Sequence, residues 1–149
     1  MIYADSSFLV SAFGSDANSE EAVNLLAAAE EPLAMISLHR LEIANAWELA
    51  VFRGRQTRAE VESAAQQMLR AVRAKSLVAM PVDWEVVLRS ARRLAQAHTA
   101  TMGNRSYDIM HVAAARHLRL NTFFSFDKRQ RTLASHLGMS VEPRTLRPS

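Results

Sequence analysis

Short apolar segments alternate with helix-like stretches along almost the whole chain, and this alternation limits the possible folds more than any other feature. Five segments are predicted to be strands: Ile2–Ala4, Leu33–Ile36, Leu77–Met80, Thr122–Ser125 and Met139–Glu142. The last is expected at a sheet edge, because Pro143 cannot donate a ladder hydrogen bond. Strands separated by helices usually form a parallel sheet covered on both faces. We therefore predict a three-layer α/β/α fold with a mostly parallel sheet of about four or five strands.

The stretches between these strands carry helix start and stop signals. The predicted helices are Ser6–Phe13, Asn18 or Ser19 to Ala29, Ser37–Arg53, Thr57 to about Lys75, Trp84–His98, Tyr107–Leu118 and Lys128–Leu137. Ser37 and Asp83 are expected N-caps, and Thr57 with Glu60 forms a capping box. Gly54 is placed to end one of these helices. The polar segment Thr99–Arg105 is predicted to be a loop.

Length and composition favour one globular domain over residues 1–149, with an irregular tail at 143–149. The chain has 149 residues, 49% of them apolar, and no Pro/Gly/Ser-rich linker divides it. It contains no cysteine, which excludes disulfides, thiolate catalysis and Cys-ligated metal sites. It shows neither a leader segment nor an apolar run long enough to span a membrane. A cytoplasmic protein without membrane association is expected.

Charge is distributed unevenly along the chain. Residues 1–88 carry 7 Lys/Arg and 12 Asp/Glu, whereas residues 89–149 carry 11 Lys/Arg and 3 Asp/Glu. A basic second half suits a polyanionic substrate. The alternative is that arginine is simply the preferred surface cation, since 16 of the 18 cations are arginine. On the helix predicted over Trp84–His98, Arg89, Arg92 and Arg93 are interpreted as a solvated face.

Four acids stand where an α/β fold would bring them together. Asp5 and Asp127 follow predicted strands, and Glu42 and Asp108 lie in the first turns of predicted helices. Any one of them alone would be interpreted as a helix cap. Together they should meet at the carboxyl edge of the sheet. Carboxylates crowded there repel one another unless a cation lies among them or some are protonated. Because these ligands are all oxygens, Mg²⁺ or Mn²⁺ is expected.

The sequences around these acids resemble the motifs of PIN-domain ribonucleases, in the family's order. The run Tyr3-Ala4-Asp5-Ser6-Ser7 resembles the family's first strand and turn, and Glu42 matches its acid on the helix after the second strand. Tyr107-Asp108-Ile109-Met110-His111-Val112-Ala113 resembles its third acidic motif, and Ser125-Phe126-Asp127 its Thr-x-Asp motif, with serine for threonine. The Asp108 and Asp127 runs look most like VapC toxins of bacterial toxin–antitoxin pairs.

This resemblance implies a PIN-like fold and a Mg²⁺- or Mn²⁺-dependent endoribonuclease. Asp5 and Asp108 would make the main metal contacts, Asp127 would complete the site, and Glu42 would orient water or act as general base. The hydroxyls of Ser7 and Ser125 would hold the carboxylates in place. Residues beside these acids could bind RNA phosphates or form salt bridges instead: Arg105, Lys128 and Arg129. His111 could touch the site, but a packing histidine is the preferred interpretation.

The resemblance also implies partners: an RNA substrate, a cognate antitoxin and a second copy of the chain in a homodimer. The toxin would inhibit translation by cutting RNA. Trp47, Leu49 and Phe52 exceed what one helix face must bury, so they are either extra core or a groove for the antitoxin or the homodimer. Two alternative functions are a catalytically silent RNA-binding module of the same fold and an Asp-based phosphatase or receiver-like domain. The second lacks the expected paired acids, since Ser6 and Ser7 follow Asp5.

Overall fold

The structure is a computed structural model that describes residues 1–146. Its chain packs as two compact units. The first, called here the 4–80 unit, runs from Ala4 to Met80. The second, called here the C-terminal unit, contains Met1–Tyr3 and the chain from Pro81 onward. Strand β1 (Ile2–Ala4) therefore supplies residues to both units. Among the described residues, no helix is both long enough and apolar enough to span a membrane.

The described strands form a five-stranded sheet with the order β3-β2-β1-β4-β5. The strands other than β1 are β2 (Leu33–Met35), β3 (Leu77–Ala79), β4 (Thr122–Phe124) and β5 (Ser140–Glu142). In the 4–80 unit, β2 pairs in parallel with β3, with Leu33 opposite Leu77. In the C-terminal unit, β4 pairs in parallel with β5, with Thr122 opposite Ser140. The predicted strands are confirmed to within one residue at each end, and β5 is the expected edge strand.

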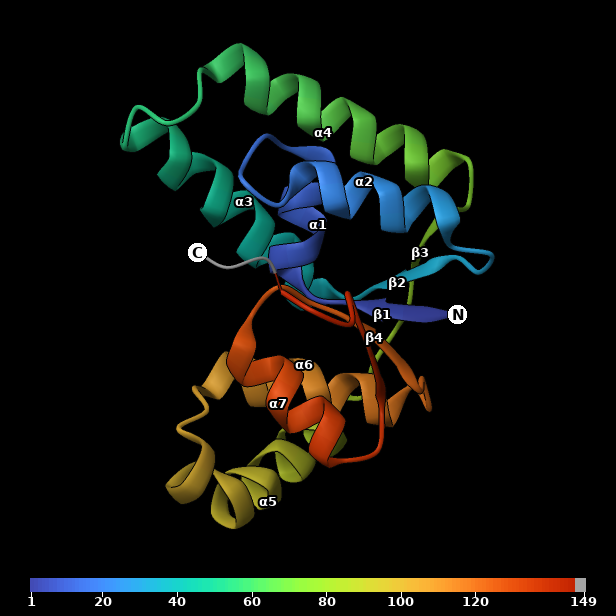
Figure 1. Cartoon of the computed structure of the whole chain (residues 1–149), viewed down its shortest axis with the longest axis vertical. Coiled ribbons are helices and arrows are strands. Elements are labelled where there is room, and N and C mark those ends of the chain that lie inside the picture. The colour runs from blue at the N-terminus through green and yellow to red at the C-terminus, as the bar shows by residue number, and fades with distance from the viewer. Residues whose placement is uncertain (147–149) are drawn as a thin grey trace. The chain divides into compact units, whose positions relative to one another are not determined.

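Four helices belong to the 4–80 unit, and Figure 1 shows them grouped with β2 and β3. They are α1 (Ser6–Phe13), α2 (Ser19–Ala28), α3 (Ser37–Phe52) and α4 (Arg58–Arg73). Helix α1 is apolar on most sides and is buried accordingly, with Phe8 and Leu9 fully inside the core. The predicted capping box opens α4: the N–H of Glu60 donates to Oγ1 of Thr57, and the N–H of Thr57 donates to the Glu60 carboxylate at 2.6 Å. The backbone N–H and the hydroxyl of Thr57 both donate to the Glu60 carboxylate, and these two hydrogen bonds lower the pKa of that carboxyl group.

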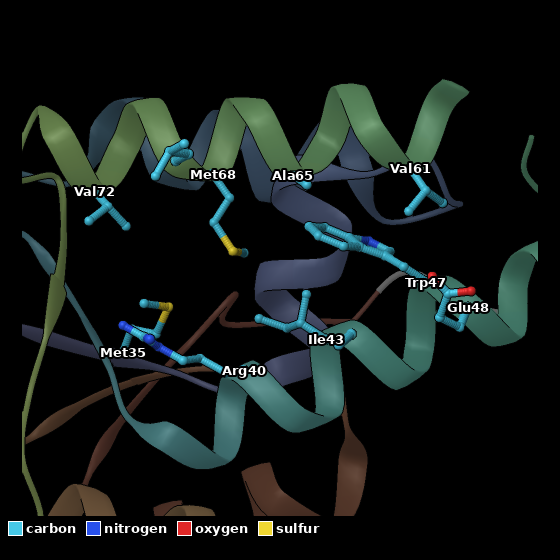
Figure 2. A pocket seen from close by; sticks show the side chains of 11 residues that line it. Met35, Arg40, Ile43, Trp47, Glu48, Val61, Ala65, Met68 and Val72 are labelled. Atoms are coloured by element: carbon cyan, nitrogen blue, oxygen red, sulfur yellow. The ribbon is translucent and has the colours of Figure 1, made fainter. Parts of the chain in front are cut away.

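Helices α3 and α4 border an open, mostly apolar pocket of about 490 Å³ (Figure 2). Trp47 and Ile43 of α3 and Met68 and Val72 of α4 extend into the space between the two helices. Trp47 is thus buried, as extra core predicts, whereas Phe52 at the end of α3 is 86% exposed. Of the apolar side chains that α3 carries beyond one buried face, Trp47 therefore lines the pocket and Phe52 is exposed to solvent.

Three helices belong to the C-terminal unit: α5 (Trp84–Met102), α6 (Ser106–His117) and α7 (Lys128–His136). Figure 1 shows them grouped with β4. The run Val112–Ala115 in the middle of α6 is completely buried, because small and β-branched side chains let neighbouring elements approach on every side. Phe123 of β4 and Leu133 of α7 are also fully buried. Helix α6, which carries Asp108, therefore runs through the core of its unit.

Two sequence predictions are wrong at helix ends. The segment Thr99–Arg105 was predicted as a loop, but α5 continues through Met102 and stops at Gly103, whose φ of +65° is left-handed. The threonines are compatible with this extra turn, since Thr101 donates its hydroxyl to the carbonyl of His98. Ser37 is not an N-cap either. Ser37 is the first residue of α3, and Ile36 occupies the N-cap position. The N–H of Ile36 donates to the Nδ1 atom of His39. In the predicted irregular tail, residues 143–146 form no helix or strand, and residues 147–149 lie outside the described part.

Candidate active site

Asp5 leaves the end of β1 and caps the helix that follows. Its Oδ1 atom accepts the backbone N–H of Phe8 at 2.7 Å and the hydroxyl of Ser7 at 2.8 Å. The side chain is fully buried. A buried carboxylate needs such donors, because burial removes the water that would otherwise solvate it. The predicted contact between Ser7 and Asp5 is therefore present, and it holds the carboxylate in one orientation.

Glu42 lies in the second turn of α3, and its Oε2 atom accepts the hydroxyl of Ser6 at 2.7 Å. Ser6 directly follows Asp5 in the chain. Adjacent serines therefore hold the two acids of the 4–80 unit, one serine for each carboxylate. Ser6 was missed in the sequence because the Asp-Ser-Ser turn alone does not indicate which hydroxyl reaches a residue 36 positions further along.

Asp108 lies in the first turn of α6 and is buried, at 6% exposure. Its Oδ2 atom accepts the backbone N–H of Arg105 at 2.8 Å, which satisfies a donor at the start of the helix. Within the described part of the chain, Oδ1 accepts no hydrogen bond. Asp108 therefore has a structural role at the helix start through one of its two oxygens.

Asp127 is the N-cap of α7, and its Oδ1 atom accepts the N–H groups of Arg129 and Gln130 at 2.8 and 3.0 Å. Its Oδ2 atom accepts no hydrogen bond from the described residues. Ser125 acts on the backbone here: its hydroxyl accepts the N–H of Asp127 at 3.0 Å. The serine in the Ser-x-Asp run thus orients the residue that carries the carboxylate.

The basic residues beside these acids have exposed side chains. Arg105, Lys128 and Arg129 form no ion pair with any acid in the described part of the chain. The salt-bridge interpretation of these three residues therefore has no support. Their positive charges face solvent, and all three residues are close to Asp108 or Asp127 in the sequence. Exposed positive charges of this kind suit contacts with phosphates.

His111, one turn after Asp108, is a packing residue of the C-terminal unit, as the preferred interpretation predicted. It is 1% exposed, and its Nδ1 atom shares a hydrogen bond of 2.8 Å with the hydroxyl of Tyr3. The Tyr3 ring meets the imidazole edge-on and stacks on Phe123 at a centroid distance of 5.3 Å. The middle of β1 is thereby attached to the helix that carries Asp108.

Replacing Tyr3 with phenylalanine should lower the free energy of unfolding by about 1–3 kcal/mol, because a buried polar partner loses its hydrogen bond while the ring contacts remain. Urea denaturation would measure this. The matched control is Tyr107→Phe, which changes the other tyrosine of the chain, 52% exposed on the same helix as His111. The control should stay within about 0.5 kcal/mol of the wild type. Equal losses for both variants would contradict a specific role for the buried hydroxyl.

The four acids are divided between the two units. Asp5 and Glu42 belong to the 4–80 unit, and Asp108 and Asp127 to the C-terminal unit. Within either unit, no three His, Asp or Glu side chains of described residues are placed to hold one metal ion. The carboxylate set itself fits a hard cation, since all the candidate donor atoms are oxygens. Convergence of the four acids on one pocket remains a prediction.

Comparison with known proteins supports the fold. The model of the PIN domain family matches residues 2–135, so the chain belongs to the PIN domain family. A crystal structure of VapC20 from Mycobacterium tuberculosis, described as a sarcin–ricin loop cleaving toxin, is similar to this chain with a TM-score of 0.66. The two share 19% sequence identity, and the similarity covers 93% of this chain and 96% of VapC20. No curated protein sequence matches the chain. The predicted PIN-like α/β/α fold is thereby confirmed.

Proposed function

We propose that this protein is a metal-dependent endoribonuclease, with Asp5, Glu42, Asp108 and Asp127 around Mg²⁺ or Mn²⁺. The observation that carries the proposal is the pair of serines at the start of α1, of which Ser7 donates to Asp5 and Ser6 donates to Glu42 on α3. Capping of α1 by Asp5 needs only the hydrogen bond that the N–H of Phe8 donates to it. Capping does not explain why the neighbouring Ser6 holds a second carboxylate, that of Glu42. Orienting hydroxyls are the usual support of metal-binding carboxylates.

The other two acids support the same proposal. Asp108 and Asp127 each use one oxygen to satisfy backbone N–H groups and keep the other without a hydrogen bond from described residues. Each unit carries two of the four acids, and together they would make a metal-binding set that neither unit has by itself among the described residues. We therefore propose that the two units form a single domain over residues 1–149 with one acidic site.

The chemistry is phosphodiester hydrolysis. When bound, the metal would supply charge neutralisation and an activated water. Asp5 and Asp108 would hold it, Asp127 would complete the site, and Glu42 would orient the attacking water or accept its proton. Arg105, Lys128 and Arg129 would bind flanking phosphates of the RNA. The expected products carry a 5′-phosphate and a 3′-hydroxyl.

The similarity to VapC20 supports a role as the toxin of a toxin–antitoxin pair that inhibits translation by cutting RNA. We propose a cognate antitoxin and a homodimer as its protein partners. The 4–80 unit offers apolar surface for such contacts: Phe52, Leu41 and Leu69 are 86, 62 and 49% exposed, and the α3–α4 pocket is lined mostly by apolar side chains, with Arg40 and Glu48 as its charged members.

The test is metal dependence of RNA cleavage. We expect the purified protein to cut RNA with Mn²⁺ or Mg²⁺, to stop when EDTA is added, and to recover when excess Mn²⁺ is restored. Cleavage that continues in EDTA would refute the proposal. RNA binding without cleavage at any metal concentration would favour the silent binding module. Transfer of a phosphoryl group to an aspartate would favour the receiver-like or phosphatase domain.

A further inference from the structure

A second groove lies in the C-terminal unit, between α5 and α6. It has a volume of about 350 Å³. The lining residues that matter here are Val86, Ser90, Arg93, Ala113, Arg116 and His117. The charged lining residues are both arginines, one on each helix. The groove therefore combines a concave shape with charge of a single sign, which concentrates positive potential inside it.

The two arginine charges are not compensated by the protein. Neither Arg93 nor Arg116 forms an ion pair with an acid in the described part of the chain. The sequence pattern placed Arg93 on a solvated face, and its side chain is exposed as expected; the structure adds that it lines a groove together with Arg116. Two guanidinium groups that share a groove repel each other, so an anion placed there gains from both.

The other polar lining groups are able to donate as well. His117 accepts the backbone N–H of Asp83 at its Nε2 atom, at 3.3 Å. The neutral ring therefore carries its proton on Nδ1, which is left as a donor. Ser90 adds a hydroxyl. Guanidinium groups match the tetrahedral oxygens of phosphate with paired hydrogen bonds, and hydroxyl and imidazole donors complete such a site.

We propose that the α5–α6 groove binds a backbone phosphate of the RNA substrate, away from the scissile bond. This proposal rests on the proposed function. Arg116 follows Asp108 by eight residues on the same helix. That separation corresponds to about 12 Å along the axis and about 80° around it. The part of α6 between these two residues is buried, so an RNA strand cut near Asp108 would reach Arg116 over the surface of the unit and not along the helix.

An RNA strand fits this groove better than an acidic protein segment. The groove belongs to the same unit as two of the proposed catalytic acids, Asp108 and Asp127, so one RNA strand on that unit can contact both places. The charge of residues 89–149, with 11 Lys/Arg against 3 Asp/Glu, also extends well beyond the groove itself. Such an extended basic surface suits a continuous polyanion.

The experiment measures binding of a labelled single-stranded RNA by fluorescence anisotropy in EDTA, where cleavage cannot occur. An RNA of about 16 nucleotides is long enough for an extended single-strand site. The double variant Arg93→Gln/Arg116→Gln should bind at least about tenfold more weakly than the wild type at low salt. Its slope of log K against log salt should be smaller by about 0.7 for each RNA phosphate that the variant no longer neutralises. With Mn²⁺ present, KM should rise while kcat is unchanged, because the arginines bind the phosphate equally before and during the reaction.

The matched control is Arg70→Gln/Arg73→Gln, which removes two exposed arginines from the end of α4. It should retain nearly all of the affinity for RNA. Equal binding by the groove variant and the wild type would refute the proposal, as would an equal loss in the control. It would also be refuted if the groove variant kept its RNA affinity and lost binding to polyglutamate, since the groove would then be a protein site. Wild-type RNA binding in EDTA without cleavage in Mn²⁺ would refute the nuclease and leave the groove supported if its variant binds more weakly.

Discussion

Replacing Asp5 with asparagine should lower metal-dependent RNA cleavage by at least about 100-fold and leave the fold intact. Loss of a group that only supports a metal ligand costs about 10–100-fold, so loss of the ligand charge itself should cost at least as much. Asparagine keeps the carbonyl oxygen that accepts the N–H of Phe8 and the hydroxyl of Ser7. Asparagine is also as good an N-cap as aspartate. The substitution therefore removes the charge of a proposed metal ligand and preserves the helix cap.

Asp83→Asn provides a close control. Asp83 is also an N-cap aspartate, and its side chain accepts the N–H of Val86 at the start of α5. It is outside the proposed site, so its variant should cleave RNA at the wild-type rate. Cleavage would be followed with a labelled RNA in Mn²⁺, and folding by circular dichroism. Wild-type activity in a folded Asp5→Asn protein would show that this residue is only a cap.

Replacing Phe8 with alanine should lower the free energy of unfolding by about 3–5 kcal/mol. Phe8 is fully buried in α1, and alanine would leave a cavity where its ring now packs. A native domain is typically stable by only about 5–15 kcal/mol, so this loss would take much of the margin. Urea denaturation followed by circular dichroism would measure the change as a lower midpoint.

Phe52→Ala is the control for this experiment. It removes the same ring from the same unit, but at a side chain that is 86% exposed. Its effect should stay within about 0.5 kcal/mol, as for surface substitutions generally. A comparable loss from Phe52→Ala would mean that this side chain is buried in solution, as expected if it contacts a second copy of the chain.

Local signals made most of the element boundaries predictable. Strands are short apolar runs, and caps such as Asp83, Thr57 and Asp127 are recognised from a few neighbouring residues. The end of α5 was missed for a physical reason. Polar residues after His98 suggested a loop, but hydroxyl groups can bond within a helix, and only a change of backbone conformation at Gly103 ends it.

The positions of the candidate acids at strand ends and helix starts were predictable, because each acid stands within a family motif and beside a local helix or strand signal. Their hydrogen-bond partners were less predictable. Ser7 is close to Asp5 in the chain and was expected as its donor, whereas Ser6 reaches Glu42 on a different helix. The Tyr3–His111 bond joins residues 108 positions apart and was not foreseen either. Contacts of this kind depend on how elements pack, which local residue patterns do not encode.

The sequence by itself determined the order of helices and strands, the exclusion of cysteine chemistry and the identity of the candidate metal-binding acids. These follow from residue type and from interactions within a few positions along the chain. Only the tertiary structure decided which serine supports which acid, that His111 is a core residue bonded to Tyr3, and that Arg93 and Arg116 share one groove. Those relations are set by packing between elements distant in sequence, where the helix face that is buried determines which side chains meet.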